Sequence, residues 1–167
     1  MNYMNKIVSD LLDYARPIHP EIMETSMHQL IQNTLLSLEI PETIKVSEVV
    51  PKRMKLEVDT VLMRRVFINL ITNSIQAMPD GGKLEIKASK KAEDVLISVK
   101  DTGVGIRKED LSKLFQPLFT TKSKGQGFGL PVCKRIVDAH GGVITVKSKV
   151  DEGTTVTVII PQQATGN

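Results

Sequence analysis

The order of helices and strands is the feature that most constrains the fold of this chain. Apolar residues spaced three or four apart predict helices, whereas alternating apolar and polar residues predict half-buried strands. The last two predicted helices are each followed by a pair of strands, whereas a doubly wound fold alternates helices with single strands. The pattern predicts an α+β fold: a two-layer α/β sandwich with helices on one face of a mixed, mostly antiparallel sheet. The expected helices span 4–16, 26–39, 60–78 and 127–140, and the expected strands span 44–50, 54–58, 84–88, 95–100, 143–148 and 154–160.

Composition excludes several functional classes. The 167 residues are 41% apolar and 25% charged, as expected for one globular domain with a short appendage. The single Cys133 cannot form an internal disulfide, which favours a reducing, cytoplasmic location. A net charge of +3 gives only weak support to DNA binding. With no Trp, two Tyr and four Phe, the chain also lacks the aromatic residues on which RNA readers stack bases, so we expect no nucleic-acid partner.

Two glycine-rich segments, 103–105 and 125–129, are candidates for contact with a ligand. Neither is a Walker phosphate loop, and neither has the third glycine of a dinucleotide-binding motif. Taken alone, each is equally compatible with a tight turn. The second segment leads directly into the helix expected at 127–140, whose free backbone N–H groups would favour a phosphate group.

Asp101 indicates which kind of ligand the first glycine segment could bind. It directly follows the predicted strand 95–100 and is followed by Gly103 and Gly105. A carboxylate in this position can accept the amino protons of adenine, and glycines allow the backbone to approach the ring. Guanine would present a carbonyl oxygen instead, so two acceptors would face each other.

Asn69 and Asn73 lie four residues apart, so they project from one face of the expected helix. Amide oxygens beside a phosphate group are suitable direct or water-mediated partners for Mg²⁺. The alternative is that both amides only satisfy hydrogen bonds within the helix or the core.

Together, these segments resemble the N, G1, F and G2 boxes of the catalytic and ATP-binding domain of sensor histidine kinases. The domain belongs to the wider class that includes DNA gyrase, heat-shock chaperone and mismatch-repair ATPases. The similarity runs from about residue 25 to residue 161 and also includes 140–142 and 153–155. The four boxes correspond to 69–74 (NLITNS), 101–106 (DTGVGI), 114–122 (LFQPLFTTK) and 125–130 (GQGFGL).

The resemblance implies a site for ATP or ADP. Asp101 would bind the adenine amino group, Thr155 would lie near the base through a water, and Asn73 would be the Mg²⁺ ligand. Residues 107–126 would form a short lid anchored by Phe115 and Phe119. The implied nucleotide-binding residues are Asn69, Asn73, Asp101, Gly103, Gly105, Ile106, Thr120, Thr121, Lys122, Lys124, Gly125, Gln126, Gly127, Phe128, Gly129, Leu130 and Thr155.

The resemblance also implies the type of chemistry, with Asn69 and Lys122 as catalytic residues. Hydrolysing relatives carry Glu at the position of Asn69, where it activates water. Because an amide cannot take the proton, we expect slow hydrolysis and transfer of the γ-phosphoryl group to a histidine of another domain. Many relatives carry Lys where this chain has Gln76, so the cation near the phosphates is expected from Lys122 or Lys124.

The resemblance implies two parts of the chain. Residues 1–20 resemble the end of a dimerisation and phosphoacceptor helix with its linker, and residues 21–167 resemble the catalytic ATP-binding domain. The expected partners are the dimerisation domain of the same kinase and a response regulator. We expect this chain to be a monomeric fragment of a longer kinase that forms a homodimer. A membrane anchor elsewhere in that kinase would be compatible with this expectation. The alternatives are a nucleotide-binding scaffold and a conformational ATPase of the same fold.

Overall fold

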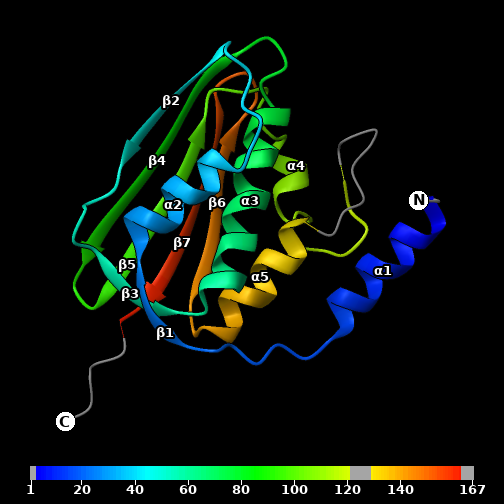
Figure 1. Cartoon of the computed structure of the whole chain (residues 1–167). Coiled ribbons are helices and arrows are strands. Elements are labelled where there is room, and N and C mark those ends of the chain that lie inside the picture. Colours follow the sequence, from blue (N-terminus) through cyan, green and yellow to red (C-terminus); the bar gives the residue numbers. More distant parts are fainter. Residues whose placement is uncertain (1–2, 121–128, 163–167) are drawn as a thin grey trace.

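A five-stranded sheet, covered on one face by helices, forms the body of the protein in the computed structural model (Figure 1). The structure describes residues 3–120 and 129–162. The helices are α1 (Tyr3–Ala15), α2 (Met27–Leu36), α3 (Thr60–Gln76), α4 (Lys108–Leu111) and α5 (Gly129–Ala139). The strands are β1 (Met23–Ser26), β2 (Ile44–Val49), β3 (Lys55–Val58), β4 (Gly82–Lys91), β5 (Asp94–Asp101), β6 (Val143–Lys149) and β7 (Gly153–Pro161).

The sheet confirms the predicted α+β sandwich. Its strand order is β2-β4-β5-β7-β6, and only the β2–β4 pair is parallel. The short strand β1 was not predicted, and it pairs with β3 in a separate two-stranded antiparallel sheet. No helix within residues 3–120 and 129–162 is both long and apolar enough to cross a membrane.

Asp59 fixes the start of α3. Its Oδ1 accepts a hydrogen bond from the backbone N–H of Leu62 at 3.0 Å, which satisfies one of the free donors of the first turn. Its Oδ2 accepts from the N–H of Glu21 at 2.9 Å, and its own N–H donates to Nε2 of His140 at 3.0 Å. Asp59 therefore joins the N-terminal segment, α3 and the end of α5 at one point.

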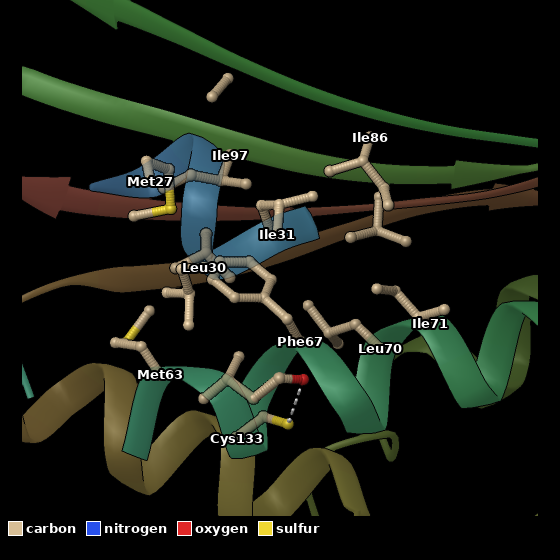
Figure 2. Close-up of a cluster of buried hydrophobic side chains, with 14 of the residues drawn as sticks. Met27, Leu30, Ile31, Met63, Phe67, Leu70, Ile71, Ile86, Ile97 and Cys133 are labelled. Atoms are coloured by element: carbon tan, nitrogen blue, oxygen red, sulfur yellow. Dashed lines mark hydrogen bonds between the residues drawn. The ribbon is translucent and has the colours of Figure 1, made fainter. Parts of the chain in front are cut away.

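The hydrophobic core lies between the sheet and α3. Figure 2 shows Phe67 of α3 pointing toward side chains of α2 and of the sheet, whereas Cys133 of α5 contacts α3 from the other side. Phe67 and Cys133 are both completely buried. Because α3 is packed on both sides, its rotation about its own axis is fixed.

Helix α1 lies apart from the sheet, with its C-terminal end near the body (Figure 1). There Asp13 forms an ion pair with Arg65 at 3.8 Å, and Arg135 donates to the carbonyl oxygen of Arg16 at 2.8 Å. The Arg135 guanidinium also lies 5.2 Å from the centre of the Tyr14 ring. The end of α1 is thus held close to α3 and α5.

Replacing Phe67 by Ala should lower the free energy of unfolding by about 3–5 kcal/mol, because removing a fully buried ring leaves a cavity. Urea denaturation followed by circular dichroism measures this loss. Val61→Ala is the control, since Val61 lies on the same helix but is 78% exposed, and it should change stability by no more than about 0.5 kcal/mol. Similar losses for both variants would contradict this account of the core.

Candidate functional site

A cavity of about 520 Å³ lies between α3, the end of β5, the loop that follows it and the start of α5. Residues far apart in the sequence line this cavity together, as expected for a binding site. It also receives side chains from the neighbouring strands β6 and β7. The predicted site residues that line it are Asn69, Asn73, Asp101, Gly105, Ile106, Thr120, Gly129 and Leu130.

Asp101 is the last residue of β5 and is only 4% exposed. Its Oδ1 accepts hydrogen bonds from the backbone N–H groups of Gly103 at 2.9 Å and of Thr154 at 3.2 Å. Its Oδ2 accepts no hydrogen bond from any residue that the structure describes. The carboxylate is therefore oriented through one oxygen, and the other remains available to a ligand.

Gly103 and Gly105 allow the loop after β5 to contact backbone on both sides. A Cβ at Gly103 would overlap the carbonyl oxygen of Ala77, and one at Gly105 would overlap that of Lys149. Gly105 also has a φ of +74°, which disfavours other residues. Gly103 does not line the cavity, so its role in this structure is the packing of the loop against the end of α3.

Asn69 and Asn73 enter the cavity from the same side of α3, as their spacing predicts. Gly129, the first residue of α5, faces both amides. A Cβ there would lie 3.9 Å from Oδ1 of Asn69 and 4.0 Å from Nδ2 of Asn73. The absence of a side chain keeps the space between the amides and the start of α5 open.

Cys133 lies beneath Asn69 and is inert. Burial raises the pKa of its thiol to about 12, and a hydrogen bond with Asn69 opposes this shift only in part. The thiol therefore stays protonated at neutral pH, which excludes it as a nucleophile. Its Sγ donates to the carbonyl oxygen of Val66 at 3.8 Å, drawn as the dashed line in Figure 2.

The start of α5 closes the cavity opposite the amides. Gly129, Leu130 and Pro131 all line it. Proline is tolerated in the first turn because the first N–H groups of a helix have no partner within the helix. The remaining N–H groups and the helix dipole make this end favourable for an anion.

Part of the predicted lid is described. Leu114 and Phe119 line the cavity, and Phe115 packs against the core. The first part of this segment forms the short helix α4. The other predicted site residues of this segment, which lie outside the described residues, are Thr121, Lys122, Lys124, Gly125, Gln126, Gly127 and Phe128.

Thr155 does not line the cavity, and the structure brings Thr154 to the expected position instead. In β7, Thr154 is paired with Asp101, and Thr155 is paired with Lys100. Successive residues of a strand point to opposite faces, so Thr155 points away from the helices. The strand register therefore places Thr154 beside Asp101 and Thr155 on the other face of the sheet.

Arg65 also lines the cavity, although it is not among the residues predicted for the site. It precedes Asn69 by four residues on α3, so the spacing that connects Asn69 with Asn73 could have identified it. Asp10 of α1 lines the cavity too, but no signal in the sequence connects it with this region. The cavity thus has a cation close to the two amides.

Comparison with known proteins agrees with this geometry. Residues 58–164 match the family described as histidine kinase-, DNA gyrase B-, and HSP90-like ATPase. The chain is 34% identical to the sensor histidine kinase ZraS of Escherichia coli (strain K12) over 169 residues, which cover 97% of this chain and 36% of ZraS. The chain therefore spans about a third of the length of this relative.

Solved structures agree as well. The catalytic domain of the histidine kinase ThkA superposes with a TM-score of 0.77 at 32% identity, covering 85% of this chain and 96% of that domain. A structure of ThkA in complex with the response regulator protein TrrA gives a TM-score of 0.79 at 28% identity, covering 96% of this chain and 47% of ThkA. The chain belongs to the histidine kinase-, DNA gyrase B-, and HSP90-like ATPase family and is a catalytic domain of the sensor histidine kinase type.

Proposed function

We propose that the domain binds Mg·ATP in this cavity and donates the γ-phosphoryl group to a histidine on a separate dimerisation domain. The observation that carries the proposal is the meeting of Asp101 with Asn69 and Asn73 in one cavity. Asp101 would bind the base, and the two amides would lie beside the phosphates. ADP would occupy the same site after transfer.

The surroundings of Asp101 support the binding of adenine. Its Oδ1 is occupied by two backbone donors, so Oδ2 is the acceptor left for an exocyclic amino group. Gly105, Ile106 and Thr154 line the cavity beside it and can enclose the flat base. Guanine would place a carbonyl oxygen against the carboxylate, which disfavours GTP.

The opposite end of the cavity supports the binding of phosphate. The N-terminus of α5 favours anions, and Arg65 of α3, which also pairs with Asp13, adds a cation to the lining of the cavity. Asn73 and Asn69 offer oxygen ligands, and Mg²⁺ needs only one or two from the protein because phosphates and waters supply the rest. Bound Mg²⁺ would neutralise charge on the transferring phosphoryl group. Lys122, Lys124 and the glycines at 125, 127 and 129 are proposed to complete this end.

Asn69 supports transfer over hydrolysis. An amide at this position cannot take a proton from water, so the residues of the cavity mainly position the phosphates and neutralise their charge. Lys122 is proposed to stabilise the transferring group. The domain would therefore retain bound ATP until an imidazole reaches the γ-phosphate.

The acceptor histidine is proposed to lie outside this chain. His140 is buried, and its Nδ1 lies 2.7 Å from the carbonyl oxygen of Ile136 while Nε2 accepts from Asp59. His28 lies 2.9 Å from Glu48, on the side of α2 that faces β2. Residues 1–20 are proposed to be the end of the dimerisation domain that carries the acceptor, and a response regulator is proposed as the next recipient.

Asp101→Asn should weaken ATP binding by about 1–3 kcal/mol, because the amide NH₂ would face the amino group of adenine. The amide oxygen can still accept from Gly103 and Thr154, so the fold should persist. Calorimetric titration with ATP and GTP measures the effect. GTP affinity should not fall, since the new donor can face its carbonyl oxygen. Equal losses for both nucleotides, or unchanged ATP affinity, would contradict adenine recognition by Asp101.

Asn73→Ala should weaken binding of ATP in the presence of Mg²⁺ by at least about tenfold more than binding of ATP in EDTA, because it removes an oxygen ligand. Fluorescence titration with a labelled ATP analogue, with and without Mg²⁺, measures the difference. Asn33→Ala is the control, since Asn33 is an exposed amide on α2 and should change neither affinity. An equal loss in both conditions would count against a metal ligand at Asn73.

The fragment should transfer radioactive phosphate from [γ-³²P]ATP to a separately purified helical hairpin that carries the acceptor histidine. The label should be acid-labile and alkali-stable, as expected for phosphohistidine. Asp101→Asn should reduce the rate, and a hairpin with His→Gln should stay unlabelled. Rapid release of inorganic phosphate without labelling would favour a conformational ATPase, and nucleotide binding with neither reaction would favour a scaffold.

A further inference from the structure

No helix within residues 3–120 and 129–162 covers the face of the sheet that points away from α2, α3 and α5, and we call it the open face (Figure 1). It is defined by the strand residues that alternate with the buried ones, as along β4, where Leu84 and Ile86 are buried and Lys83 and Lys87 are exposed. The lysines of the open face are Lys45, Lys83, Lys87, Lys91, Lys100, Lys147 and Lys149, and its acidic residues are Glu85 and Asp94.

The positive charge of the protein is concentrated on the open face. Seven lysines against two carboxylates give it a net charge of +5, which exceeds the +3 of the whole chain. Among the described residues, only Lys149 of these lysines forms an ion pair, with Glu152 at 2.9 Å. The open face thus carries a net positive charge, although Lys100 is paired in register with Glu85 and Lys91 with Asp94, and the rest of the protein is slightly acidic.

Protection of sheet edges does not explain this arrangement. Lysines on an edge strand prevent it from pairing with the edge of another sheet, and this role explains Lys45 on β2 and Lys147 on β6. Lys83, Lys87 and Lys100, however, lie on β4 and β5, which are flanked by other strands on both sides. Lys83 is moreover paired directly with Lys45, a like-charge contact that disfavours the fold. Lys100 is paired in register with Glu85, which gives it a structural role, whereas Lys83 and Lys87 need another explanation.

The residue types of the open face favour one kind of partner. All its cations are lysines, whose ammonium groups attract anions without a fixed geometry. The planar guanidinium group of arginine instead binds individual phosphates of nucleic acids through two hydrogen bonds. Lysine is also depleted from protein–protein interfaces. Leu96, Ile159 and Val143 are paired in register at the end of the sheet remote from Asp101, and they add apolar side chains to the open face. A cationic surface with an apolar margin matches the interface of an anionic lipid bilayer.

We propose that the open face is a docking surface for anionic lipid bilayers. It lies on the opposite side of the sheet from the nucleotide cavity, so binding to a bilayer would leave the cavity accessible. Lysines near an anionic surface each strengthen binding by about fivefold, and salt weakens the attraction. The proposal goes beyond the nucleotide chemistry and does not depend on it.

Co-sedimentation of the full chain with vesicles tests the proposal. The chain should bind vesicles of phosphatidylglycerol and phosphatidylcholine at low salt, and it should not bind phosphatidylcholine alone. The triple variant Lys83→Gln, Lys87→Gln, Lys100→Gln should lower the partition coefficient by about 100-fold. Since these strands are interior, the variant should not expose a sheet edge. Its thermal unfolding temperature should not fall, because the like-charge pair of Lys83 with Lys45 is removed, and its ATP affinity should match that of the unmodified chain.

A matched variant removes the same charge elsewhere. Lys55→Gln, Lys108→Gln, Lys134→Gln changes three exposed lysines on β3, α4 and α5, and it should lower the partition coefficient by no more than about threefold. Absence of binding to anionic vesicles at low salt would overturn the proposal, as would an equal loss in both triple variants. Tighter binding to duplex DNA than to vesicles, dependent on Lys83, Lys87 and Lys100, would replace the bilayer by a nucleic acid.

Discussion

The burial of α3 between the sheet and α5 determines the geometry of the candidate site. Phe67 and Leu70 pack toward the sheet, and Cys133 contacts the helix from the other side. Because residues along a helix are related by a fixed rotation, this packing also determines where Asn69 and Asn73 point. The hydrophobic core and the phosphate end of the cavity therefore cannot change independently. A rotation of α3 that improved the packing of the core would also displace the two asparagines.

Backbone contacts build the other end of the cavity. The pairing of β5 with β7 brings the Thr154 amide to Asp101, and Gly153 allows this approach, since a Cβ there would overlap the Asp101 carbonyl oxygen. The loop after β5 is held between Ala77 and Asp151 by two backbone hydrogen bonds through Val104. The proposed base-binding end thus depends on strand register and on glycine, whereas the phosphate end depends on side chains.

Periodicity made most of the fold and much of the cavity predictable from the sequence. The helix containing Asn69 and Asn73 and the strand ending at Asp101 could be located because their apolar patterns are long and regular. The residues that the sequence did not reveal are those whose positions depend on the pairing of segments far apart in the chain. Strand β1 is too short to show alternation, Thr154 was missed because its direction follows from pairing with Asp101, and Asp10 approaches only through the tertiary placement of α1. Gly103 packs against the Ala77 carbonyl oxygen and does not line the cavity, a contact between distant segments that the sequence does not reveal.

Consecutive residues of β5 contribute to two different surfaces of the protein, the open face and the cavity. Lys100 belongs to the open face, and Asp101, the next residue, belongs to the cavity. Point substitutions at alternate positions can therefore alter one surface while the other is retained, so the two could diverge separately among relatives. Insertion or deletion of a single residue within β5 would instead exchange the two sets of side chains, burying lysine and exposing valine. Natural variation in this strand should accordingly proceed by replacement at constant length.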